Sequence, residues 1–140
     1  MRVTLSKLIA SPRFFLLVAW VLTISWLSLT PAPPAPEVPL FGYDKLFHAA
    51  AYASLTLLAG WTFSGIISLS GRLWLLIASS AIVIGGLLEI AQAWFTVTRK
   101  AEAADFIANC VGAGIALLAA RIATIRRRTR QARVKAQEKR

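Results

Sequence analysis

The chain is organised around residues 41–52, which read Phe-Gly-Tyr-Asp-Lys-Leu-Phe-His-Ala-Ala-Ala-Tyr. Three ionisable side chains, those of Asp44, Lys45 and His48, open a segment that carries no further charge across residues 49–71. A charged side chain at membrane depth costs about 3 kcal/mol or more unless it is paired or close to water. These three groups therefore need partners or a function.

The sequence as a whole is too apolar for an ordinary soluble domain. Hydrophobic residues make up 57% of the 140 residues and the mean hydropathy is +0.64, whereas soluble domains contain about half apolar residues. The apolar residues form long blocks without an amphipathic period, so we predict an all-α integral membrane protein with one small domain. Cys110 is the only cysteine, which excludes an intrachain disulfide.

Four hydrophobic blocks predict four transmembrane helices within a domain spanning residues 1–125. The predicted spans are residues 14–30, 44–67, 73–96 and 105–125. Residues 31–43 form a Pro-rich external loop, because its five prolines cannot continue a helix. Residues 126–140 form a basic cytoplasmic tail, expected as a frayed helix. A signal peptide is the alternative for the first block, but the prolines that follow it make a poor cleavage site.

The basic residues predict the orientation. Nine of the 16 Lys and Arg residues lie at or beyond Arg121, and three more lie within residues 1–13. The positive-inside rule then predicts that both termini are cytoplasmic. A strongly basic balance, here a net charge of +10, is also seen in nucleic-acid-binding proteins. The membrane topology explains the charge here, so we expect membrane lipids as partners and do not expect nucleic acid. Arg99, on the outer side, is an exception and therefore a candidate for a functional role.

Three polar sets occur at the outer ends of the last three predicted spans. They are Asp44, Lys45, His48 and Tyr52 in the second span, Glu89 and Gln92 in the third, and Asp105 and Asn109 in the fourth. Residues three or four apart share one face of a helix. The same faces carry small residues such as Gly85 and Gly112, which allow helices to approach closely in lipid. We predict that the sets meet in an outward-opening pocket between these three helices.

Several of these residues also have a structural interpretation. Asp44 is suited to cap the second helix, and Lys45 can extend its ammonium group to the lipid headgroups. Gln92 and Asn109 can form hydrogen bonds between helices. Arg99 can anchor the chain at the membrane interface or pair with a nearby carboxylate.

His48 and Glu89 are the hardest to explain by structure alone, because a Glu deep in a span needs a proton, a cation or a hydrogen-bond partner. We predict that His48 and Glu89 carry protons and that Asp44 and Asp105 orient them. The candidate ligand-binding residues are Lys45, Tyr52, Gln92, Arg99 and Asn109. A metal held by His48, Glu89 and Asp105 is conceivable, but one His with scattered carboxylates is weak support for zinc, so no metal or other cofactor is expected.

The order of these residues resembles the VanZ-like family of small bacterial membrane proteins. The family pattern has Asp-Lys-x-x-His followed by Tyr, then Glu-x-x-Gln, a basic residue, and Asp-x-x-x-Asn-x-x-Gly. This chain matches it at Asp44, Lys45, His48, Tyr52, Glu89, Gln92, Arg99, Asp105, Asn109 and Gly112. The resemblance covers roughly residues 40–120. It departs from the pattern at residues 93–98, which lack the prolines associated with that stretch.

The resemblance implies a multi-pass protein of the bacterial cytoplasmic (inner) membrane, in a family named for a member linked to glycopeptide resistance. Our first hypothesis is a site that binds or modifies the headgroup of an envelope lipid or cell-wall precursor. The alternative is a non-catalytic assembly or partner protein in which the polar cluster is a structural hydrogen-bond network. Proton-coupled transport would require a homo-oligomer, because four short spans leave little room for alternating access. Whether the chain is an enzyme stays open.

Overall fold

The computed structural model describes residues 5–30, 43–96 and 102–137, and these ranges contain helices and turns without a strand. The helices are α1 (Leu5–Ile9), α2 (Pro12–Leu29), α3 (Tyr43–Ser64), α4 (Gly71–Phe95) and α5 (Ala103–Gln137). Helices α2 to α5 are long and apolar enough to cross a membrane. The predicted all-α bundle of four membrane-spanning helices is therefore confirmed, and the chain is treated below as a multi-pass membrane protein.

Serine caps define the start of two of the long helices. The Ser11 hydroxyl accepts a hydrogen bond from the Phe14 N–H at 3.3 Å, and Pro12 follows at the first helical position. The Ser70 hydroxyl accepts from the Leu73 N–H at 3.2 Å in the same way. Each hydroxyl satisfies one of the free N–H groups that every helix start exposes, which sets where α2 and α4 begin.

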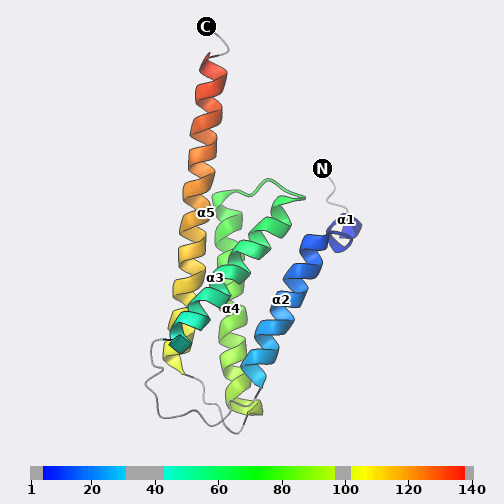
Figure 1. Cartoon of the computed structure of the whole chain (residues 1–140), viewed down its shortest axis with the longest axis vertical. Helices are drawn as coiled ribbons and strands as arrows, with labels where there is room; N and C mark the ends of the chain where they lie inside the picture. Colours follow the sequence, from blue (N-terminus) through cyan, green and yellow to red (C-terminus); the bar gives the residue numbers. More distant parts are fainter. Residues whose placement is uncertain (1–4, 31–42, 97–101, 138–140) are drawn as a thin grey trace.

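The four long helices alternate in direction, so the bundle has two chemically different ends (Figure 1). The end that holds α1, the α3–α4 turn and the far part of α5 carries Arg13, Arg72 and Arg121, and we call it the basic end. The opposite end gathers the start of α3, the end of α4 and the start of α5. We call it the acidic end, because Asp44 and Asp105 lie there. The positive-inside rule predicts that the basic end is cytoplasmic.

Helix α5 extends well beyond the other three (Figure 1). Its 35 residues correspond to about 52 Å at about 1.5 Å per residue. We predicted a fourth span ending near Ile125 and a frayed tail, whereas the structure has one continuous helix to Gln137. The reason is local, because residues 126–137 contain no Gly or Pro and are rich in Arg, Ala and Gln, which favour helix.

Small residues let α3 and α5 pack closely. A Cβ atom at Gly112 would overlap the backbone carbonyl of Ala49 on α3. The buried face of α5 also includes Ala108, Ala113, Ala116 and Ala120. Close backbone approach through small residues is the usual way in which helices associate in lipid, where no hydrophobic effect drives them together.

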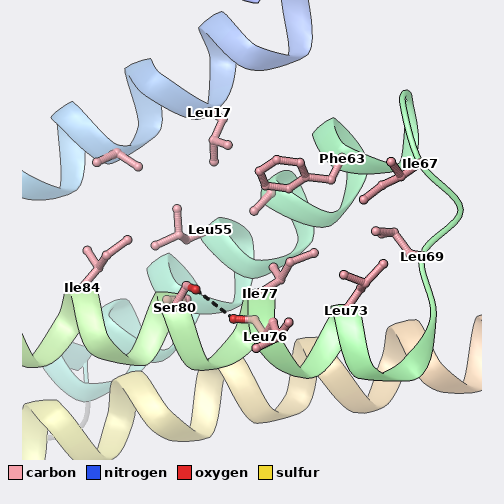
Figure 2. A pocket seen from close by; sticks show the side chains of 13 residues that line it. Leu17, Leu55, Phe63, Ile67, Leu69, Leu73, Leu76, Ile77, Ser80 and Ile84 are labelled. Atoms are coloured by element: carbon pink, nitrogen blue, oxygen red, sulfur yellow. Dashed lines mark hydrogen bonds between the residues drawn. The ribbon is translucent and has the colours of Figure 1, made fainter. Parts of the chain in front are cut away.

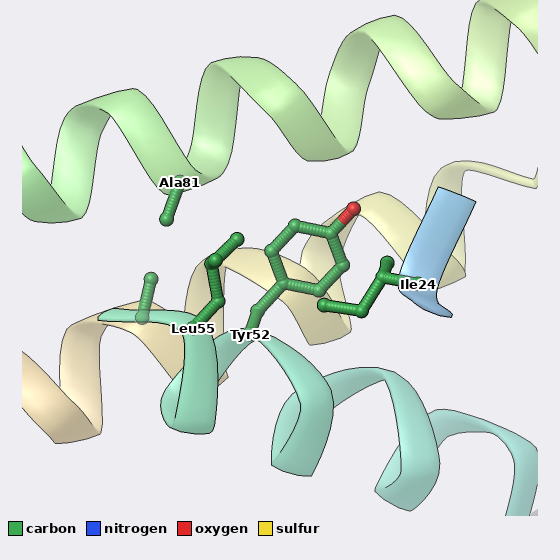
Figure 3. Packing of buried hydrophobic residues seen from close by; sticks show 5 residues of the cluster. Ile24, Tyr52, Leu55 and Ala81 are labelled. Atoms are coloured by element: carbon green, nitrogen blue, oxygen red, sulfur yellow. The ribbon is translucent and has the colours of Figure 1, made fainter. Parts of the chain in front are cut away.

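The apolar core lies beside this contact. Tyr52 and Leu55 of α3 project toward Ala81 of α4 and Ile24 of α2, and all four are buried (Figure 3). Large apolar side chains such as Trp26 are exposed on the outer faces of the bundle. Apolar surface of this extent marks a membrane-facing protein.

Candidate functional site

Polar side chains from α3, α4 and α5 meet at the acidic end of the bundle. The first turns of α3 supply Asp44, Lys45 and His48, and the first turns of α5 supply Asp105 and Asn109. From the last third of α4, Glu89 reaches the same place, where its Oε1 lies 3.9 Å from the Nδ1 of His48. Residues more than 40 positions apart in the sequence therefore share one site.

Lys45 lies among three carboxylates. Its ammonium donates to Asp44 Oδ2 at 3.2 Å, to Glu102 Oε2 at 2.9 Å and to Asp105 Oδ1. A lysine ammonium has three donors, and these contacts use all of them. Lys45 was predicted to bind ligand, but in this arrangement its donors go to the protein's own carboxylates.

His48 is surrounded by hydrogen-bond acceptors. Its Nδ1 lies 3.1 Å from Asn109 Oδ1. Its Nε2 lies 3.9 Å from Asp44 Oδ1 and 3.8 Å from Asp105 Oδ2. One oxygen atom from each of these two aspartates and the imidazole nitrogen form a set whose members all lie within 4.8 Å of one another. Among the residues that the structure describes, these three form a group that could hold a metal ion.

Two buried polar groups next to His48 are only partly satisfied. Glu89 is 6% exposed and Asn109 is fully buried. Within the ranges that the structure describes, Glu89 Oε2 and Asn109 Nδ2 have no hydrogen-bond partner. Buried polar atoms are almost always paired in proteins, so each unpaired one calls for an explanation such as an ion or a ligand.

Tyr52, Gly85 and Asn109 fill the space below this polar layer. A Cβ atom at Gly85 would lie 2.9 Å from Tyr52 Cε1 and 3.0 Å from Asn109 Nδ2. Tyr52 is 2% exposed and belongs to the core cluster. Tyr52, predicted to bind ligand, is thus a packing residue of the core, and it also lines the groove described below.

Gln92, another predicted ligand-binding residue, is not part of this group. The side chain of Gln92 is buried and donates to the Ser28 carbonyl of α2 at 2.9 Å, so it joins α4 to α2. Arg99 lies outside the described residues. Glu102 was not among the predicted site residues, although its position one turn before Asp105 places it beside the first residues of α5 and within reach of Lys45.

A groove between α2 and α3 opens beside the polar cluster. Its volume is about 320 Å³, and it is lined by Trp20, Thr23, Ile24, Leu27, Ser28, Asp44, Phe47, His48, Ala51 and Tyr52. Asp44 and His48 supply its ionisable groups, and the rest of the lining is mostly aromatic and aliphatic, with the hydroxyl residues Thr23 and Ser28 on α2. We expected the opening between the second, third and fourth spans, but this groove uses the first span as its second wall.

A second cavity lies between α2, α3 and α4 nearer the basic end (Figure 2). Its volume is about 410 Å³ and its lining is apolar apart from Ser80. The Ser80 hydroxyl donates to the Leu76 carbonyl of its own helix at 2.9 Å, so it has no free donor for a ligand. This cavity lacks groups for chemistry, and the candidate site remains the acidic end.

Comparisons of the chain with protein-family models, with curated proteins and with solved structures found no match. Function must therefore be argued from the site itself. The site offers one imidazole, several carboxylates, one fully engaged ammonium and an adjoining groove.

Proposed function

We propose that this chain is a VanZ-like membrane protein that binds the headgroup of an envelope lipid or lipid-linked cell-wall precursor at its acidic end. The observation that carries the proposal is the groove between α2 and α3, which has ionisable groups at one end and a mostly apolar lining elsewhere. The resemblance supports it, because the pattern residues Asp44, Lys45, His48, Glu89 and Asp105 surround one position.

The groove suits an amphiphile oriented along the bundle. Trp20, Leu27 and Phe47 provide apolar surface for an acyl or prenyl chain. Asp44, with a side chain 56% exposed, lies at the polar end next to His48. A carboxylate is an acceptor only, so the part of the headgroup that reaches Asp44 would carry hydroxyl or ammonium donors.

His48 is the residue to which a proton-transfer step in this site would be assigned. Carboxylate oxygens of Asp44, Glu89 and Asp105 lie within 3.9 Å of its ring nitrogens. Imidazole is the commonest general acid or base in proteins because its ordinary pKa is close to neutral pH. The proposal itself is for binding and needs no turnover.

Filling the groove tests this function. The purified 140-residue chain is placed in nanodiscs of bacterial polar lipid and then released from them. Native mass spectrometry identifies the lipid that it retains. Ala51→Phe occupies the groove, so we expect it to lose the retained lipid. Ala50→Phe adds the same side chain at the neighbouring exposed position, outside the groove lining, and should retain it. Equal retention by both variants would contradict the proposal.

A structural role for the cluster is the second candidate, and a specific observation favours it. Lys45 of α3 pairs with Asp105 of α5 and with Glu102, which precedes α5, and His48 contacts Asn109. These polar contacts join α3 to α5 beside the close approach of Gly112 to Ala49. In that case the protein would act as a membrane assembly partner.

Substitutions at His48 separate the two candidates. If the cluster is a ligand site, His48→Ala abolishes lipid retention while the thermal unfolding temperature in detergent stays close to that of the unmodified chain. If it is a structural network, His48→Ala lowers that temperature, and a shape-matched apolar residue at the same position partly restores it. Glu89→Gln extends the test to α4.

A further inference from the structure

The contacts of His48 define which of its nitrogens carries a proton. Asn109 Oδ1 lies 3.1 Å from Nδ1 and can only accept. Nδ1 therefore carries the hydrogen, and in the neutral imidazole Nε2 presents a lone pair. That lone pair faces Asp44 Oδ1 at 3.9 Å and Asp105 Oδ2 at 3.8 Å. Three electron-rich atoms thus point at one another, an arrangement that a cation between them would stabilise.

Lys45 holds both aspartates in this arrangement. It contacts Asp44 through Oδ2 and Asp105 through Oδ1, which leaves Asp44 Oδ1 and Asp105 Oδ2 toward His48. In metal sites, a second group usually orients each ligand. A histidine donates its other ring N–H to a carbonyl or carboxylate, and a carboxylate accepts a hydrogen bond at the oxygen that does not bind the metal. Here Asn109 and Lys45 occupy those two positions.

Glu89 adds a buried and incompletely paired carboxylate at the Nδ1 edge of the His48 ring. It is 6% exposed, its Oε1 lies 3.9 Å from the same imidazole, and its Oε2 has no hydrogen-bond partner within the part of the chain that the structure describes. The carboxylates of Asp44, Glu102 and Asp105 surround the ammonium of Lys45, and Glu89 adds a fourth carboxylate beside His48. Among the residues that the structure describes, carboxylates therefore outnumber cationic side chains in this cluster, and a bound cation would offset that negative charge.

We propose that the acidic end binds one divalent transition-metal ion through Asp44, His48 and Asp105. The three ligand atoms lie within 4.8 Å of one another. Ligands on a tetrahedral zinc ion lie about 3.4 Å apart for bonds of about 2.1 Å, so small side-chain rotations bring these atoms to bonding distance. From the sequence the carboxylates were scattered and no metal was expected, but the structure gathers two of them at the imidazole. Zn²⁺ accepts imidazole nitrogen and carboxylate oxygen ligands, and three protein ligands leave a coordination position for water or an exogenous group.

This inference goes beyond the proposed lipid function, because the ligand set is complete without a lipid. It uses the imidazole and carboxylate oxygens that the Lys45 contacts leave free. A bound ion would also give the polar end of the groove a positive charge that its own residues lack. The two proposals have separate tests, since Ala51→Phe fills the groove but leaves all three proposed ligands in place.

Direct metal binding tests the inference. Metal is first removed from the 140-residue chain in detergent with a chelator. Calorimetric titration with Zn²⁺ then measures the affinity, and elemental mass spectrometry after desalting measures the zinc retained per chain. We expect about one Zn²⁺ per chain, with affinity at least about tenfold weaker in Asp44→Asn and His48→Gln. Asp44 has a 56% exposed side chain, so Asp44→Asn should fold normally. Ala51→Phe should bind Zn²⁺ like the unmodified chain.

Glu102→Gln is the matched control. It removes one carboxylate that pairs with the Lys45 ammonium, and it leaves all three proposed ligands intact. Because Glu102 is exposed, we expect its loss to change Zn²⁺ affinity by less than about fivefold. Weakening by Glu102→Gln equal to that by Asp44→Asn would mean that diffuse negative charge attracts the ion, and would overturn the proposed ligand set.

The single histidine of the chain allows a readout in the unmodified protein. With ¹⁵N-labelled histidine, Zn²⁺ should shift the Nε2 resonance strongly and leave Nδ1 as a protonated nitrogen. Because this measurement uses the unmodified protein, it tests the proposal even if the His48 variant does not fold. Absence of Zn²⁺ retention, or a shift centred on Nδ1, would overturn the proposal.

Discussion

The contact between Gly112 and Ala49 gives the sharpest prediction about how the site is held together. A Cβ atom at Gly112 would overlap the Ala49 carbonyl, and the obstructing atoms are backbone, so they cannot rotate away. Overpacking a close contact typically costs about 1–3 kcal/mol. We expect Gly112→Ala to reach the upper part of that range, because α3 and α5 must separate along their length. The ion pair between Lys45 and Asp105 bridges the same two helices and would be strained with them.

The assay is unfolding of the purified chain in detergent, followed by the fluorescence of its five tryptophans. A loss of about 2–3 kcal/mol should lower the unfolding temperature by several degrees, at roughly 2–8 °C per kcal/mol. Gly114→Ala is the control on the same helix, because a Cβ atom there has no heavy atom within 4 Å. It should be neutral or stabilise by up to about 1 kcal/mol. Equal behaviour of the two variants would refute the close α3–α5 contact.

Three further substitutions probe the polar contacts by the same unfolding assay. Lys45→Met leaves three carboxylates without their counter-charge and should destabilise the folded chain by about 1–3 kcal/mol. Adding 0.5 M salt should reduce this loss. An unchanged unfolding midpoint would contradict the pairing of Lys45 with three carboxylates. Glu89→Gln keeps the shape of the side chain and should stay within about 1 kcal/mol, since Oε2 has no partner among the described residues. Gln92→Leu removes the hydrogen bond to Ser28 and should cost about 1 kcal/mol, and no change would mean that this bond does not hold α2.

The fold could be predicted from the sequence because membrane spans need long apolar blocks. The four predicted spans correspond to α2, α3, α4 and α5, with boundaries differing by a few residues at most ends. The exception is the far end of α5, where hydrophobicity stops near Ile125 but the helix does not. Charge marks the end of a membrane span, whereas helix propensity and the absence of Gly and Pro set the end of the helix.

The site was only partly predictable. Periodicity places Asp44, Lys45 and His48 on one face, and alternating helix direction brings them to the same end as Asp105. Helix phase says which residues share a face but does not say which neighbour that face contacts. Gln92 lies three residues after Glu89 and is therefore about 60° away around the helix. That offset is enough for its side chain to reach Ser28 of α2.

The contacts of long, flexible side chains could not be predicted from the sequence. Lys45 could equally extend to the lipid headgroups, and only the positions of Glu102 and Asp105 in space show that it turns inward. The groove between α2 and α3 likewise depends on how two helices diverge, a property of packing that no local pattern encodes.

The distance between Lys45 Nζ and Asp105 Cγ in lipid tests most directly whether α3 and α5 bring their charges together. The chain has two aspartates, so Asp44→Asn leaves Asp105 as the only site for an aspartate ¹³C label. Solid-state NMR with ¹⁵N-labelled lysine should then show one ammonium resonance strongly dephased by Asp105, and Lys45→Arg should abolish it. If no lysine resonance is dephased, the charges of the two helices do not meet, and the common site does not exist.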